Sequence, residues 1–151
     1  MTGEGLSVSR IADEIESLFA ARGAGRAWST PKSMILPPDG RLLMTMMAAS
    51  EDPPLMAVKS LVMNSANPEQ GLPQINAQVT LIHAHTGEAL ATIDGNWVTE
   101  IRTAALSLVA ARRMARPDAS SLALVGTGVQ GRSHLQAFAA SFPLELSLIH
   151  I

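Results

Sequence analysis

SSLALVGTGVQG, residues Ser120 to Gly131, is the stretch of the chain that decides the fold. A short apolar run ends at Gly126, and the glycines at 126, 128 and 131 have the spacing G-x-G-x-x-G. A helix is expected to follow, because Leu135, Phe138 and Ala139 fall on one helical face. An apolar strand, a glycine turn and an amphipathic helix in this order are typical of a unit that binds a dinucleotide.

Each glycine of the turn has its own physical reason in such a unit. The first makes the tight turn, the second lets a pyrophosphate approach the backbone, and the third lets the helix pack closely on the strand. Exposed amides at the start of the helix receive the phosphate charge. We therefore expect NAD or NADP as cofactor, bound by Gly126, Gly128, Val129, Gln130 and Gly131. The alternative interpretation is a glycine-rich turn with a structural role only.

The choice between NAD and NADP stays open. An acidic residue about 20 residues after the motif normally binds the ribose hydroxyls. Counting forward from Gly131 reaches His150 and Ile151, and no Asp, Glu or Arg stands at the end of the candidate second strand, residues 144–151.

A long helix is expected just before this unit, from Thr99 to Ala115. Thr99 is the expected N-cap, and Arg116-Pro117 closes the helix. The helix is apolar nearly all round, which indicates that it is buried, either joining two domains or packing against the next sheet.

The first part of the chain has a different pattern. Ser9–Arg22 predicts a helix, with apolar residues at helical spacing and a glycine at its end. Several strands after one helix predict an α+β domain with a largely antiparallel or mixed sheet. The last two strand candidates are joined by residues 85–88, a Gly-containing connection that predicts a hairpin. The candidates are Leu42–Met47, Met56–Val62, Ala77–Ala84 and Ala89–Ile93.

The composition excludes several classes of protein. With 151 residues, 47% hydrophobic and 16% charged, and a formal net charge of −2, the chain has no electrostatic footprint for nucleic acid or an anionic membrane. It has no cysteine, no signal-peptide pattern at its start and no apolar stretch long enough for a bilayer, so a cytoplasmic protein is expected. No metal site is expected either, because nothing completes a zinc set around His83 and His85. His134 is expected at the surface.

A recognisable order of residues runs from Val58 to Gln130. It resembles the ornithine cyclodeaminase/mu-crystallin family, over about residues 28–143. The most specific pieces are Arg102-Thr103-Ala104-Ala105 and its distance to the glycine turn. The full order is Val58-Lys59, Asn64, Asn67-Pro68, Gly71-Leu72-Pro73, Thr86-Gly87, Asp94-Gly95-Asn96, Thr99-Glu100-Ile101-Arg102-Thr103-Ala104-Ala105 and Gly126-Thr127-Gly128-Val129-Gln130.

The resemblance implies an α/β protein of two domains. Residues 1–97 are expected to form an α+β substrate and dimerisation domain, 98–118 a connecting helix, and 119–145 the start of an incomplete Rossmann dinucleotide-binding domain. It also implies a homodimer that converts a small amino acid or cyclic imino acid with a nicotinamide cofactor in the full-length protein. The reaction is either deamination of the ornithine cyclodeaminase kind or reduction of an imine. The alternatives are an NAD(P)H-dependent binding protein of the mu-crystallin type and an inactive fragment.

The resemblance gives roles to three cationic residues. Lys59 aligns with the family lysine near the substrate carboxylate and the reacting carbon. Arg102 aligns with the arginine that binds the substrate carboxylate and lies against the cofactor. These two are the expected catalytic residues, and both are expected to bind substrate. Lys32 falls close to the position of another carboxylate-binding arginine and is the third candidate for substrate binding.

The local sequence leaves a plainer alternative for each of these positions. Lys59 lies in the apolar run Leu55–Met63, where an ammonium group tends to be functional, unless it points outward from an edge strand. Arg102 lies in the first turn of an apolar helix, where its planar guanidinium suits a carboxylate, unless it is a surface arginine. Thr103 either hydrogen-bonds a cofactor phosphate or bonds the backbone of its own helix.

Two stretches depart from the family pattern. Met46-Met47-Ala48 stands where the family more often has Met-Pro-Ala, and the acid/base aspartate of the family is expected beyond Ile151. The tail Leu146–Ile151 is what the codons CTG TCT CTT ATA CAC ATC encode, and these codons match a transposon-end adapter. We interpret 146–151 as non-native read-through. The alternative is a genuine second strand.

Overall fold

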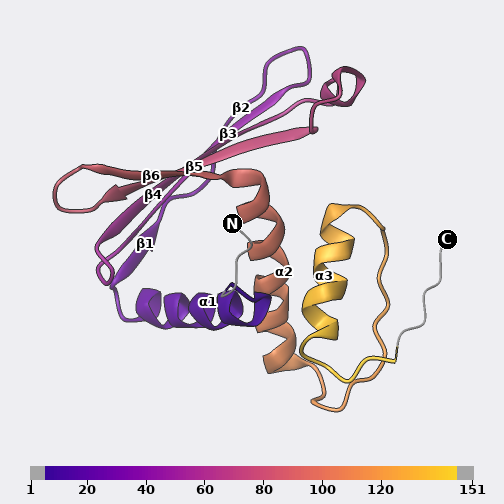
Figure 1. The fold of residues 1–151 in the computed structure, drawn as a ribbon. Helices are drawn as coiled ribbons and strands as arrows, with labels where there is room; N and C mark the ends of the chain where they lie inside the picture. Colours follow the sequence, from indigo (N-terminus) through magenta and orange to yellow (C-terminus); the bar gives the residue numbers. More distant parts are fainter. Residues whose placement is uncertain (1–5, 146–151) are drawn as a thin grey trace. The chain divides into compact units, whose positions relative to one another are not determined.

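The computed structural model describes residues 6–145, and the tail 146–151 lies outside the described residues. The chain separates into two compact units, one made of Met1–Ser17 and Thr99–Ile151 and the other of Leu18–Val98. Figure 1 shows their elements as ribbons. In the described part of the chain, no helix is long and apolar enough to cross a membrane.

The unit Leu18–Val98 is an antiparallel sheet. The strand order is β1-β3-β4-β5-β6, and β2 pairs with β3 beyond the end of β1. This confirms the predicted α+β sheet. The long strands extend past their predicted ends, except that β5 ends at His83, one residue before the predicted Ala84. The bounds are β1 Ala27–Ser29, β2 Ser33–Ile35, β3 Leu42–Ser50, β4 Leu55–Met63, β5 Ile75–His83 and β6 Ala89–Asp94.

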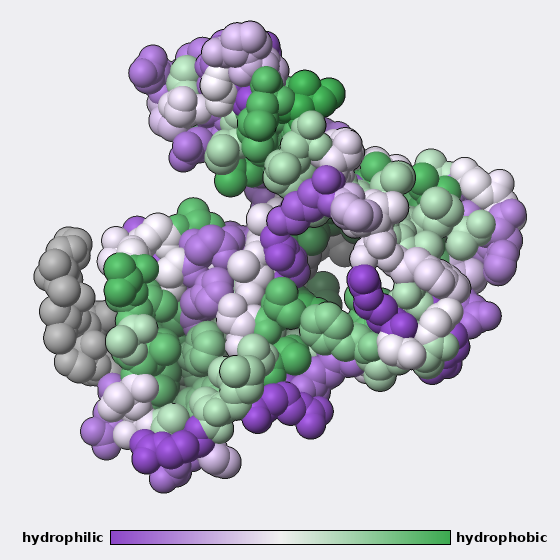
Figure 2. All heavy atoms as spheres, turned by 180° about the vertical axis from the view of Figure 1, so that it is seen from behind, coloured by the Kyte–Doolittle hydropathy of each residue, from purple (hydrophilic) through white to green (hydrophobic). Residues whose placement is uncertain are grey.

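The register divides the sheet into two faces. Lys59 lies opposite Met46 on β3 and Val79 on β5, so these three side chains share one face. We call it the Lys59 face. The other face, the opposite face, carries large apolar side chains that are 37–65% exposed. They are Trp28, Ile35, Met47, Met56 and Val62. Apolar side chains are also open to solvent on the surface seen in Figure 2.

The connections between the last strands follow turn chemistry. A 3₁₀ turn, η1 (Asn67–Gln70), lies between β4 and β5. The predicted hairpin between β5 and β6 is confirmed, because the two strands pair antiparallel around residues 84–88. The His83 N–H donates to the Glu88 carbonyl oxygen at 2.9 Å and closes the turn.

The long helix α2 (Gly95–Met114) begins four residues before the predicted N-cap Thr99, so that prediction was wrong. The cap is Asp94, whose Oδ1 accepts from the backbone N–H groups of Asn96 (2.8 Å) and Trp97 (3.4 Å). Gly95 allows this start to lie against the sheet, because a Cβ there would stand 2.6 Å from the Ala77 carbonyl carbon. Asp94 is thus both the last residue of β6 and the N-cap of α2.

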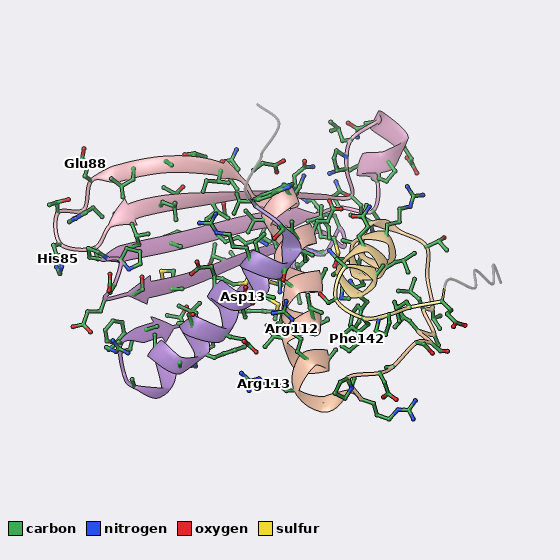
Figure 3. All side chains as sticks on the ribbon, turned by 60° about the horizontal axis from the view of Figure 1, so that its bottom comes forward. Asp13, His85, Glu88, Arg112, Arg113 and Phe142 are labelled. Atoms are coloured by element: carbon green, nitrogen blue, oxygen red, sulfur yellow. The ribbon has the colours of Figure 1, made fainter. Side chains whose placement is uncertain are left out.

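The unit that contains Thr99–Ile151 is built around two helices that cross. Helix α1 (Val8–Gly23) contributes Ala12 to a fully buried cluster with Ala105 and Leu108 of α2. The alanines let the helix backbones approach closely. Arg112 of α2 donates to the Asp13 carboxylate at 2.7 Å and to the Ser9 hydroxyl at 2.6 Å (Figure 3). These contacts group the first half of α1 with α2 rather than with the sheet.

Helix α3 (Val129–Ala139) runs beside α2 (Figure 1). The apolar run before it was predicted to be a strand, but residues 119–127 form no strand in the described part of the chain. The physical reason is that a strand needs a neighbour to complete its ladder. A backbone bond near this run joins the Glu145 N–H to the Ser120 carbonyl oxygen at 2.9 Å. Val125 is fully exposed.

Candidate functional site

The three glycines of the turn differ in their surroundings. Gly126 has φ +99°, a conformation that L side chains rarely adopt. A Cβ at Gly128 would meet nothing within 4 Å, whereas a Cβ at Gly131 would overlap the Gly126 carbonyl oxygen. The turn therefore needs one glycine for its backbone angle and one for close packing of α3. Gly128 satisfies neither need and opens onto free space.

The N-terminus of α3 is open to an anion. Gly128 is its N-cap, in an extended conformation, and no side-chain hydrogen bond caps the helix. Val129 is 60% exposed and Gln130 is exposed beside it. The first amides of a helix lack intrahelical partners and carry part of the positive end of the helix dipole. This end of α3 suits a phosphate group.

Side-chain contacts join α2 to α3 behind the turn. The Gln130 side-chain amide donates to the Thr99 carbonyl oxygen at 3.4 Å. His134 Nε2 lies 2.9 Å from the Ser107 hydroxyl, and its Nδ1 lies 2.6 Å from the Gln130 carbonyl oxygen. His134 was predicted at the surface but is half-buried here. Its helical spacing from Gln130 was visible in the sequence, but the partner on α2 is 27 residues away.

Arg102 and Thr103 lie on α2, in the same unit as the glycine turn. Arg102 is exposed, and Thr103 donates its hydroxyl to the Thr99 carbonyl oxygen at 2.5 Å. Of the two interpretations of Thr103, the structure shows the one in which the hydroxyl bonds the backbone of its own helix. A hydroxyl that donates to its own helix keeps lone pairs that can accept a further hydrogen bond.

Lys32 and Lys59 come together in the sheet unit. Both line one pocket of about 290 Å³ on the Lys59 face. Lys59 is half-buried, whereas Lys32 is exposed in the connection between β1 and β2. The sequence did not indicate that Ala48 and Ala57 pair directly across β3 and β4 within this pocket. Two cations above small apolar side chains suit a compact carboxylate.

A larger hollow of about 660 Å³ lies on the opposite face of the same sheet. A row of polar side chains crosses it from strand to strand. The Asn96 Oδ1 beside this row is buried without a hydrogen-bond partner among the described residues. The row consists of Ser33, Thr45, Ser60, Gln78 and Asp94.

The candidate residues thus form one group in each unit. Lys32 and Lys59 meet in the sheet unit, whereas Arg102, Thr103 and the glycine turn belong to the helical unit. No group of three or more His, Asp or Glu side chains that could hold a metal ion occurs within residues 6–145.

Comparison with known proteins gives a consistent result. The model of the ornithine cyclodeaminase/mu-crystallin family matches residues 1–150. A Δ1-pyrroline-2-carboxylate/Δ1-piperideine-2-carboxylate reductase of Azospirillum brasilense is 33% identical over 115 residues, which are 76% of this chain and 36% of the reductase.

Solved structures show the same fold. Δ1-Pyrroline-2-carboxylate reductase of Thermococcus litoralis, in complex with NADH and L-proline, matches with a TM-score of 0.87 and 29% identity over 94% of this chain and 44% of its own. A dimeric archaeal alanine dehydrogenase with bound NAD matches with a TM-score of 0.85 and 27% identity over 92% of this chain and 42% of its own. The chain therefore spans less than half the length of these proteins.

Proposed function

Because the chain belongs to the ornithine cyclodeaminase/mu-crystallin family, we propose that it forms part of an enzyme that converts a small amino acid or cyclic imino acid with NAD or NADP. The proposed activity is that of a complete protein as long as these relatives, of which this chain spans less than half. The observation that carries the proposal is the glycine turn, in which Gly128 opens onto free space at the uncapped start of α3. Elsewhere in the same chain, Lys32 and Lys59 line one small pocket.

The residues of the turn fit a dinucleotide. The pyrophosphate would approach the backbone at Gly128, where a Cβ has no neighbour within 4 Å, and accept from the amides of Val129 and Gln130. Gly126 and Gly131 would hold the turn and α3 in position for it. When bound, the nicotinamide supplies hydride exchange with the α-carbon of the substrate.

The substrate's carboxylate would be bound by the cationic residues. Lys59, half-buried at the pocket wall, would place its ammonium group next to the reacting carbon, and Lys32 would add a second charge from the connection between β1 and β2. Arg102 would add a bidentate pair, because its planar guanidinium matches two carboxylate oxygens. In this proposal the chain's own contribution to the reaction is orientation and charge.

The direction of the reaction is the finer part of the proposal. Reduction of a cyclic imine and deamination of an amino acid need the same carboxylate contacts and the same α-carbon geometry. The A. brasilense and T. litoralis proteins are reductases by name, and these similarities favour imine reduction.

We also propose that the complete protein is a homodimer that buries the opposite face of the sheet. Five large apolar side chains on this face are 37–65% exposed, and the polar row beside them includes hydroxyl and amide groups. Large apolar side chains left exposed on one face of a sheet commonly mark a protein interface. The archaeal alanine dehydrogenase of the same fold is a dimer.

The test is turnover by the complete protein. NADH and NADPH are offered separately with Δ1-pyrroline-2-carboxylate, and the loss of nicotinamide absorbance is followed. In parallel, release of ammonia from L-ornithine is measured with NAD+. Turnover in either assay supports the proposal. Failure of both, with a folded protein, contradicts it.

A further inference from the structure

His134 joins the two helices of the glycine-turn unit through both of its ring nitrogens. It lies on α3, and its Nδ1 is 2.6 Å from the Gln130 carbonyl oxygen in the first turn of the same helix. Its Nε2 is 2.9 Å from the Ser107 hydroxyl oxygen on α2. All three residues belong to one compact unit of the chain. One half-buried imidazole therefore connects α2 to the start of α3.

The acceptor at Nδ1 decides where the ring carries its proton. A carbonyl oxygen can only accept, so Nδ1 must donate, and a neutral imidazole then has a bare second nitrogen. The Ser107 hydroxyl can rotate and donate to the bare Nε2. The reverse arrangement would put the Nδ1 lone pair against an oxygen at 2.6 Å. The two contacts thus hold the neutral ring of His134 in the Nδ1–H tautomer.

These contacts act on a peptide group in the first turn of α3. The Gln130 carbonyl and the Gly131 N–H share one peptide plane, so a bond that holds the carbonyl also directs the amide. Gly131 supplies one of the amides at the helix start that have no intrahelical acceptor. The side-chain amide of Gln130 also donates to the Thr99 carbonyl oxygen on α2 at 3.4 Å. Gln130 is thereby held to α2 twice, once by its own side chain and once through His134.

The two residues before His134 also bond backbone carbonyls, but in a different way. The Ser133 hydroxyl donates to the Val129 carbonyl oxygen at 2.7 Å, and Arg132 Nε donates to the Thr127 carbonyl oxygen at 3.1 Å. Both of these bonds stay within the glycine turn and α3, whereas the bonds of His134 extend to α2. Ser133 is therefore a reference for a hydroxyl group that bonds α3 without joining it to α2.

We infer that His134 is a positioning residue for the cofactor: held in the Nδ1–H tautomer by Ser107, it fixes the peptide between Gln130 and Gly131 in the orientation that a pyrophosphate needs. The inference rests on the proposed function, because it assumes that a dinucleotide binds at the start of α3. It goes further by giving a part in cofactor binding to two side chains behind the turn. His134 acts through the backbone of Gln130.

Two substitutions of His134 separate its ring nitrogens. The amide nitrogen of asparagine can take the place of Nδ1, so His134→Asn keeps a donor for the Gln130 carbonyl. Glutamine is longer and places its amide near Nε2, so His134→Gln faces Ser107 and loses that donor. NADH, or NADPH where it binds more tightly, is titrated into the complete protein by nicotinamide fluorescence. His134→Gln should raise the Kd about fivefold, equivalent to about 1 kcal/mol, and His134→Asn should stay within about twofold of the wild type.

Ser107→Ala tests the contact on α2. In the wild-type background it releases the ring and should raise the cofactor Kd by about threefold to fivefold. In the His134→Asn background the side chain is too short to reach Ser107, so the same change should have no measurable effect. Ser133→Ala is the matched control, and its Kd should stay within about twofold of the wild type, because its hydroxyl bond lies within α3.

The tautomer has a signature that does not depend on cofactor binding. Nitrogen-15 NMR of the histidine-labelled complete protein distinguishes protonated from bare ring nitrogens at about pH 8.5, where histidine side chains are ordinarily neutral. The signals of His134 are identified by their loss in His134→Gln. Nδ1 is expected to carry the proton and Nε2 to be bare.

The outcomes separate this inference from the proposed function. A bare Nδ1, a wild-type Kd in His134→Gln or Ser107→Ala, or equal weakening in His134→Asn and His134→Gln would overturn the inference. Weakening in Ser133→Ala as large as in Ser107→Ala would overturn it too. Failure of the wild type to bind either cofactor would overturn both proposals. The expected pattern of Kd values without turnover of any substrate would support the role of His134 and count against the proposed reaction alone.

Discussion

Replacing Gly131 by alanine should destabilise the turn, whereas the same change at Gly128 should only weaken cofactor binding. At Gly131 the added Cβ would overlap the Gly126 carbonyl oxygen and would lie 3.3 Å from Leu124 Cδ2. The first of these is a backbone atom, which cannot turn away as a flexible side chain can. Helix α3 must therefore shift away from the turn.

The magnitude follows from two opposing effects. Overpacking typically costs about 1–3 kcal/mol, and overlap with a backbone oxygen belongs to the upper part of this range, about 2–3 kcal/mol. Alanine in a helix is favoured over glycine by about 1 kcal/mol, which offsets part of that loss at Gly131. A net loss of about 1–2 kcal/mol should lower the Tm of the complete protein by roughly 1–4 °C, because a protein of about 320 residues shifts by about 1–2 °C per kcal/mol.

Gly128 is the matched control for this substitution. A Cβ there meets nothing within 4 Å and φ is −68°, so Gly128→Ala should unfold like the wild type. The methyl group would instead stand where the pyrophosphate meets the backbone. Loss of one charge-assisted hydrogen bond, about 1.5–3 kcal/mol, should raise the Kd for NADH by about tenfold to a hundredfold.

The assay pairs thermal unfolding of the complete protein with titration of NADH by nicotinamide fluorescence. Gly131→Ala should change both readouts, and Gly128→Ala only the second. Wild-type stability in Gly131→Ala, or wild-type NADH affinity in Gly128→Ala, would refute the roles assigned to these two glycines.

Three further predictions concern the roles of side chains, the assembly and the tail. Arg102→Lys and Lys59→Ala in the complete protein should each lower kcat/KM by about a hundredfold, because misplacing the α-carbon by about 1 Å has such an effect. The NADH affinity of Lys59→Ala should stay within about threefold of the wild type. Wild-type kinetics in either variant would rule out the role assigned to that residue. Met56→Lys, on the opposite face of the sheet, should shift the complete protein toward monomer in light scattering at micromolar concentration, and an unchanged dimer would place the interface elsewhere. Residues 146–151 should be encoded by CTG TCT CTT ATA CAC ATC in the source DNA, and any other set of codons would restore Leu146–Ile151 as native sequence.

Much of the architecture could be predicted because its signals are local. The glycine spacing, the helix after it and the four long strands each depend on residues close together in the sequence. The strands β1 and β2 were missed because each has only three residues, too few for an alternating pattern to be visible.

The start of α2 was misplaced because two cap candidates compete. Thr99 and Asp94 both belong to residue types that cap helices, and the sequence favoured the one next to the apolar run. The deciding contact is the close approach of Gly95 to Ala77, 18 positions earlier, which only the folded sheet provides.

The candidate site was predictable in its charged residues but not in its shape. Lys32 and Lys59 were singled out by resemblance, yet their shared pocket depends on the pairing of β1 and β2 with β3. Nothing in the sequence marks Ala48 and Ala57 as pocket residues, because alanine is common on any strand. The contact between His134 and Ser107 was missed for a similar reason, because Ser107 lies on another helix.

A crystal structure of the complete protein with NAD+ and L-proline is the most direct test of the central claim. We expect the pyrophosphate at the backbone of Gly128 and the start of α3. We expect the proline carboxylate within hydrogen-bond distance of the Lys59 ammonium, with the proline ring over Ala48 and Ala57. A pyrophosphate bound away from Gly128, or a carboxylate that does not contact Lys59, would contradict it.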